Sequence, residues 1–150
     1  MSLAEKLETL SERFPGQLPH VKTEEATKNA FVMPVINALG FNVFDPSEVV
    51  PEFVADVGVK KGEKVDYAIY VGGKPLILIE CKTAGSKLSL KHASQLLRYY
   101  GVTEAKIAVL TNGIDWEFFT DIDTPNRMDE RPFMTVSFGR LDSDAIEQLG

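Results

Sequence analysis

The chain has 150 residues and is 44% hydrophobic and 25% charged, proportions that fit one globular domain large enough to bury a core. Its net charge of −6 argues against tight nucleic-acid binding without help, because contacts with phosphate dominate that affinity. No apolar run is long enough to span a membrane, and the N-terminus has no signal-peptide pattern. Cys81 is the single cysteine, which excludes an internal disulfide. We therefore expect a cytoplasmic protein.

The N-terminal segment, residues 1–22, is expected to hold one short helix and a loop. Leu3, Leu7 and Leu10 recur at helical spacing, so a helix is predicted over residues 2–13. The Phe-Pro-Gly sequence that follows is expected to end this helix, and residues 17–22 to form the loop.

A second helix is predicted to begin after Thr23, its N-cap, and to end before Gly40, with a kink at Pro34. Glu24 and Glu25 follow the cap, where the helix dipole stabilises carboxylates. The residues by themselves favour this electrostatic explanation of the two glutamates over a functional role.

Three strands are expected next, the first over residues 49–54, where Pro51 indicates an edge position. The second begins near Lys64 and carries Asp66. A turn at two glycines joins it to the third, an apolar run of the kind that is buried on both faces of a sheet. The third strand ends in Glu80-Cys81-Lys82.

Side chains alternate along a strand, so Glu80 and Lys82 are expected on one face. On the neighbouring strand, Asp66 is expected to share a face with Ala68 and Tyr70. If Asp66 and Glu80 face the same way, two carboxylates and one amine meet in a small space.

Two close carboxylates repel each other unless a cation joins them, and Mg²⁺ suits such oxygen ligands. A bound ion lowers the pKa of its water, and Lys82 can orient or deprotonate that water, which suits phosphodiester hydrolysis. An equally acceptable alternative is a simple ion pair of Glu80 with Lys82 that caps a buried strand.

A third long helix is predicted over residues 86–101, with Ser86 or Ser89 as its cap. Gln95 and Tyr99 lie on its polar flank. Its core stripe is expected to consist of Ala93, Leu96, Leu97 and Tyr100.

The remaining strands are predicted over residues 107–110, 114–120 and 133–138, the first two joined by a hairpin at Thr111-Asn-Gly113. We divide the single domain into residues 1–22, a core over residues 23–120, and residues 121–150, which hold a polar loop, the last strand and the start of a helix. Because that helix is cut at Gly150, we expect a domain excised from a longer protein. The element order predicts an α/β fold of the α+β type, with a central mixed sheet flanked by helices.

Asp66, the thirteen residues after it and Glu80-Cys81-Lys82 resemble the signature of the PD-(D/E)XK nuclease superfamily, although Val65 stands where the signature has proline. The segments that resemble one branch of it, in order, are residues 23–28, 38–41, 65–67, 79–82, 95–99 and 110–113. That branch is the N-terminal nuclease domain of type I restriction enzyme R subunits and its stand-alone prophage and bacterial relatives. The resemblance covers roughly residues 20–150 and implies a restriction-endonuclease-like αβββαβ core.

The resemblance also implies the function and the site, namely a metal-dependent DNA endonuclease domain of a restriction or prophage system. Asp66, Glu80 and the backbone carbonyl of Cys81 are expected to hold Mg²⁺, or Mn²⁺ in its place. Lys82 is expected to manage the attacking water. Glu25, or Glu24 in its place, is expected to assist the metal.

The branch also implies that Gln95 and Tyr99 support the site or contact DNA. The implied partners are DNA and either other restriction-modification subunits or a fused helicase domain. The acidic charge favours an alternative, a non-catalytic nucleic-acid-binding or assembly module on the same scaffold. A third possibility is a nuclease that is active only within a larger restriction complex.

Overall fold

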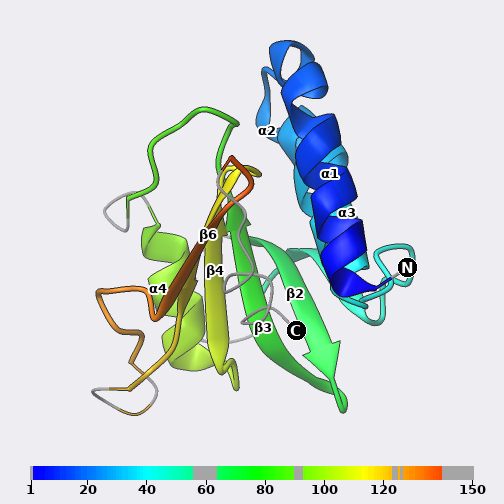
Figure 1. Cartoon of the computed structure of the whole chain (residues 1–150). Coiled ribbons are helices and arrows are strands. Elements are labelled where there is room, and N and C mark those ends of the chain that lie inside the picture. The colour runs from blue at the N-terminus through cyan, green and yellow to red at the C-terminus, as the bar shows by residue number, and fades with distance from the viewer. Residues whose placement is uncertain (1, 56–63, 90–92, 123–124, 126, 140–150) are drawn as a thin grey trace.

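The computed structural model describes residues 2–55, 64–89, 93–122, 125 and 127–139. Within these residues a mixed six-stranded sheet has helices on both faces, and its strands follow the order of the chain from β1 to β6 (Figure 1). The strands are β1 (Val49–Phe53), β2 (Val65–Val71), β3 (Lys74–Cys81), β4 (Ile107–Thr111), β5 (Asp115–Phe119) and β6 (Met134–Ser137). The predicted α+β fold with a central mixed sheet is confirmed, as are the edge position of β1 and the β4–β5 hairpin.

Neighbouring strands are antiparallel except for β3 and β4, which are parallel. Parallel neighbours need a crossover, and helix α4 (Ser94–Val102) lies in the connection between them. The carboxyl ends of β3 and β4 therefore meet at one edge of the sheet, and the antiparallel strand β2 begins there. The candidate site residues Asp66, Glu80 and Lys82 all belong to this edge.

Helix α1 (Leu3–Gln17) runs through Pro15, so the prediction that it ends at the Phe-Pro-Gly sequence is wrong. Phe14 is buried and packs against Phe31 and Phe138, with ring centroids 4.6 and 5.3 Å away. Proline removes one helical hydrogen bond, and the burial of this ring outweighs that loss. The predicted loop includes a 3₁₀ turn, Leu18–His20.

The second predicted helix forms as three pieces, α2 (Glu24–Thr27), a π turn η2 (Lys28–Val32) and α3 (Met33–Ala38). Thr23 caps it, because its side-chain oxygen accepts from the backbone N–H of Ala26 at 3.0 Å, and Gly40 ends it with φ 105°. The expected irregularity at Pro34 is the π turn just before it. A proline ring crowds the carbonyl one turn earlier, and a wider turn relieves that contact.

Helix α4 begins later than the predicted start at Ser86 or Ser89, which lie in a loop. The expected core positions Ala93, Leu96 and Tyr100 are buried. Leu97 is exposed, and Tyr99 takes the inward position with its ring 6.0 Å from that of Phe53. The larger ring buries more apolar surface than leucine does, which decides which flank of the helix faces the sheet.

Two apolar cores fill the layers on either side of the sheet. Helices α1 and α3 cover one face, where Phe14, Phe31 and Ile79 are buried, and α4 covers the other, where Ala68 and Leu78 are buried (Figure 1). None of the described helices is both long enough and apolar enough to cross a membrane. The helix expected after residue 142 lies outside the described residues.

Candidate active site

The Asp66 side chain joins β2 to β3 where their regular pairing stops. The last main-chain partners at this end are Tyr67 and Ile79. One residue further, Asp66 Oδ2 accepts a hydrogen bond of 2.7 Å from the backbone N–H of Cys81. The carboxylate is therefore held against the peptide bond that links Glu80 to Cys81.

Strict alternation does not hold at the start of β2. Val65 packs with Ala68 on the α4 side, although the two are an odd number of positions, three, apart. Asp66 is contacted by Lys28 of η2, whose Nζ lies 3.4 Å from Oδ1. Tyr67 packs in the opposite core, so alternation breaks between Val65 and Tyr67, and the shared face of Asp66 and Ala68 stays a prediction. On the neighbouring strand Glu52 has φ 51°, outside the extended region.

Glu80 is a buried carboxylate that the described residues satisfy only in part. Its side chain is 5% exposed, and its Oε2 atom has no hydrogen-bond partner. The ammonium of Lys82 lies 3.5 Å from this oxygen, so the expected ion pair exists, at a distance too long for a good hydrogen bond. Burial raises the pKa of Glu80, the charge of Lys82 opposes the rise, and the charges of Asp66 and Glu24 add to it.

Lys28 is the site residue that the sequence reasoning missed. Its side chain is 13% exposed, and Nζ lies 2.6 Å from Glu25 Oε1 and 3.4 Å from Asp66 Oδ1. Burial by itself lowers the pKa of Lys28, but the hydrogen bond with Glu25 and the attraction of Asp66 outweigh it, and the pKa is raised. Its spacing of three residues from Glu25 was a visible signal, yet this spacing does not predict the contact with Asp66.

The two glutamates of the first turn take different places. Glu25 is 76% exposed and is bound to Lys28, so it is linked to Asp66 through that lysine. The charge of Glu24 contributes to the raised pKa of Glu80. Both carboxylates thus act on the site, one through an ion pair and the other through its field.

Thr27 and Gly113 fix the helix that carries Lys28 against the ends of β3 and β4. Thr27 is fully buried, donates its hydroxyl to the Thr23 carbonyl at 2.8 Å and accepts from the Ala84 N–H at 3.0 Å. Gly113 has φ 90°, and a Cβ atom there would lie 2.8 Å from Cβ of Phe31. Only glycine lets the β4–β5 turn approach so closely.

A comparison with family models matches residues 52–127 to the N terminus of the type I restriction enzyme R protein. The match spans just over half of the chain. The chain belongs to this family. The resemblance to R-subunit N termini is thereby confirmed, and the matched range includes Asp66, Glu80 and Lys82, whereas Lys28 precedes it. Neither the curated proteins nor the solved structures give a match.

In this R-protein N-terminal domain, the two residues of the Gln-x-x-x-Tyr element have different surroundings. Tyr99 is fully buried, so its ring cannot reach a ligand at the surface from this position. Gln95 lies one turn earlier on α4 and is half-buried. A supporting role suits the position of Tyr99, and a contact role suits that of Gln95.

The residues of the strand edge carry oxygen atoms of the kind that a divalent cation binds. Among the described residues no cluster of three or more His, Cys, Asp and Glu side chains could hold a metal, but the expected ligand set needs only two carboxylates and one carbonyl. Glu80 contributes a buried oxygen for which the described part of the chain supplies no hydrogen-bond partner. In a strand the N–H and C=O of one residue point to the same neighbour, so the Cys81 carbonyl is directed toward β2 and Asp66.

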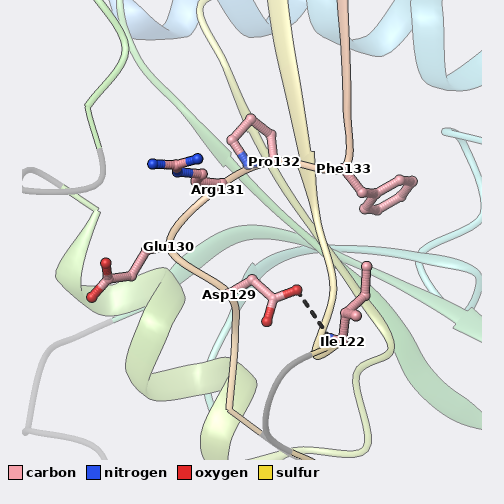
Figure 2. Close-up of a pocket in the computed structure, with 6 residues that line it drawn as sticks. All are labelled: Ile122, Asp129, Glu130, Arg131, Pro132 and Phe133. Atoms are coloured by element: carbon pink, nitrogen blue, oxygen red, sulfur yellow. Dashed lines mark hydrogen bonds between the residues drawn. The ribbon is translucent and has the colours of Figure 1, made fainter.

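A separate pocket of about 370 Å³ lies in the segment between β5 and β6 (Figure 2). A hydrogen bond of 3.0 Å from the Ile122 N–H to Asp129 Oδ2 links two of the residues that line the pocket. None of the strand-edge residues lines it, and it is bordered by Ile122, Asp129, Glu130, Arg131, Pro132 and Phe133. We assign no role in the chemistry to this pocket.

Proposed function

We propose that this domain is a nuclease of the PD-(D/E)XK kind, which hydrolyses DNA phosphodiester bonds with a divalent cation as part of a restriction system. Its membership in the R-protein N-terminal family supports the restriction context. The observation that carries the proposal is the buried environment of the Glu80 carboxylate. One of its oxygens is buried, has no hydrogen-bond partner among the described residues, lies 3.5 Å from the Lys82 ammonium and is under the influence of the Asp66 charge.

A buried carboxylate of this kind is costly to keep in a stable fold. Carboxylates with a perturbed pKa and a specific charged partner are found most often at functional sites, because catalysis or ligand binding requires them there. An oxygen-binding cation between Glu80 and Asp66 would satisfy both charges. This is the reason for preferring a metal site over a structural ion pair.

Asp66, Glu80 and the Cys81 carbonyl would hold Mg²⁺ or Mn²⁺. The bound ion supplies a water of lowered pKa and shields phosphate charge. Lys82, whose side chain is 30% exposed, meets solvent beside Glu80 and orients or deprotonates the attacking water. Glu25 assists from the helix side.

DNA is the proposed substrate, and Gln95 contributes a contact from α4. Because the chain carries a net charge of −6, we assign most of the DNA affinity to other restriction-modification subunits or to a fused helicase domain. The nuclease site would then act on DNA that a partner presents.

Cleavage of plasmid DNA in Mg²⁺ or Mn²⁺ tests the proposal, with Lys82→Ala as the variant. Loss of a general acid–base group is expected to slow cleavage by about 10²–10⁴-fold. Lys74→Ala is the matched control, since Lys74 lies at the other end of β3 and pairs only loosely with Glu104, at 3.8 Å. Cleavage that is unchanged by Lys82→Ala would sink the proposed role of this lysine.

The alternative, a non-catalytic nucleic-acid-binding or assembly module, is favoured by one observation. Asp66 already has a cation beside it, the ammonium of Lys28 at 3.4 Å. Calorimetric titration with Mn²⁺ separates the two functions, because a nuclease site binds the ion and Asp66→Asn abolishes that binding. Normal metal binding without cleavage would indicate a nuclease that needs its complex.

A further inference from the structure

We propose that Lys28 is the resident counter-ion of Asp66, and that it keeps the affinity of this site for divalent cations low. The inference rests on the metal site of the proposed function, although not on cleavage. It concerns a residue that precedes the matched range of the family.

The two oxygens of Asp66 have different partners. Oδ2 accepts the Cys81 N–H at 2.7 Å, so the main chain holds it in place. Oδ1 faces the Lys28 ammonium at 3.4 Å, and this is the oxygen left for a metal. A magnesium ion binds oxygen at about 2.0–2.1 Å, so the ion and the ammonium would compete for the same carboxylate oxygen at close range. Two cations so near each other repel, and the side chains that surround them screen this poorly.

Glu25 determines where Lys28 goes when the ion binds. The contact of Nζ with Glu25 Oε1, 2.6 Å, is much shorter than its contact with Asp66. Glu25 is largely exposed and lies on the same helical segment, three residues earlier. Lys28 can therefore leave Asp66 and stay paired with Glu25, without moving the buried helix. Metal binding would therefore replace the ion pair of Asp66 with Lys28 by a contact of Asp66 with the metal ion.

The segment that carries Lys28 is held firmly, so the ammonium is presented to Asp66 by the fold. The neighbouring residue Thr27 is fully buried and is bonded to both Thr23 and Ala84. Such anchoring fixes the backbone of Lys28 at the end of β3. A lysine that merely covered an apolar surface would need no such placement.

Calorimetric titration of Mn²⁺ into the metal-free domain tests the inference. Lys28→Met removes the charge and keeps the length of the side chain, and we expect Kd to fall about tenfold, which corresponds to about 1.4 kcal/mol. Lys28→Arg keeps the charge and should leave Kd within about twofold of the wild-type value by the same argument. Lys74→Met removes an exposed lysine at the far end of β3 and should change nothing.

Thermal denaturation with and without Mn²⁺ gives a second measurement that is independent of cleavage. Metal-free Lys28→Met should melt below the wild type, because Asp66 loses its cationic partner. Saturating Mn²⁺ should raise the Tm of this variant more than that of the wild type. Lys28→Gln serves as a second neutral variant if the methionine variant does not fold.

The outcomes separate this inference from the proposed function. A wild-type domain that binds no Mn²⁺ overturns the metal site, and the inference with it. A wild-type domain that binds Mn²⁺ while folded neutral variants bind it equally or more weakly overturns the inference alone. Tighter binding in both neutral variants, with Lys28→Arg unchanged, supports it.

Discussion

Gly113→Ala tests the close approach that places the helix of Lys28 beside the strand edge. Gly113 has φ 90°, and a Cβ built on it lies 2.8 Å from Phe31 Cβ, 2.9 Å from Phe31 Cδ2 and 3.1 Å from Thr27 Cγ2. Phe31 and Thr27 are both fully buried. Neither can give way unless the π turn and α2 shift away from the β4–β5 turn.

Two costs add in this variant. The left-handed backbone costs an alanine about 1–2 kcal/mol relative to glycine. Overpacking a buried contact costs about 1–3 kcal/mol more. The expected loss in the free energy of unfolding is therefore about 2–5 kcal/mol, a large share of the roughly 5–15 kcal/mol that stabilises a typical domain. For a chain of this size it should lower Tm by roughly 4–20 °C.

Denaturant titration followed by circular dichroism measures the loss, and Gly85→Ala is the matched control. Gly85 has φ 88°, but a Cβ there meets nothing within 4 Å. The control should therefore lose only the backbone cost, about 1–2 kcal/mol. Equal losses in the two variants would refute the argument that the turn is packed too closely for a side chain.

Three further substitutions test the site and its support. Burial raises the pKa of Glu80, so the folded protein keeps this proton to a higher pH than the unfolded chain, and stability falls as pH rises above the ordinary glutamate value of 4.5. Glu80→Gln should thus raise the Tm of the metal-free domain at neutral pH, and a gain that persisted at pH values well below 4.5 would contradict the cause. Tyr99→Ala should cost about 3–5 kcal/mol because the ring is fully buried, whereas Gln95→Ala should change stability by no more than about 0.5 kcal/mol. Denaturant titration of the two variants would contradict this if their losses were similar.

The local elements follow from patterns that span only a few residues. Thr23 and Gly40 bound a helix because a cap and a left-handed stop act on adjacent backbone groups. The strands β2 and β3, and the hairpin at Gly113, follow from alternation and turn chemistry. With these elements in order, the α+β sheet and the edge that collects Asp66, Glu80 and Lys82 were within reach of the sequence.

Only the tertiary structure decided which side chains pack together where several could. Helix α1 continues past Pro15 because Phe14 finds a buried place beside Phe138, far away in the sequence. Tyr99 displaces Leu97 from the core because the sheet offers room for a ring.

The candidate site shows the same division. Lys28 meets Asp66 across 38 residues of chain, and Asp66 accepts a hydrogen bond from the Cys81 amide where the pairing of β2 with β3 ends. Helical and strand periodicity act through neighbouring peptide groups, so they can be read locally. A partner for a buried charge is chosen only when distant segments pack together and water is excluded between them.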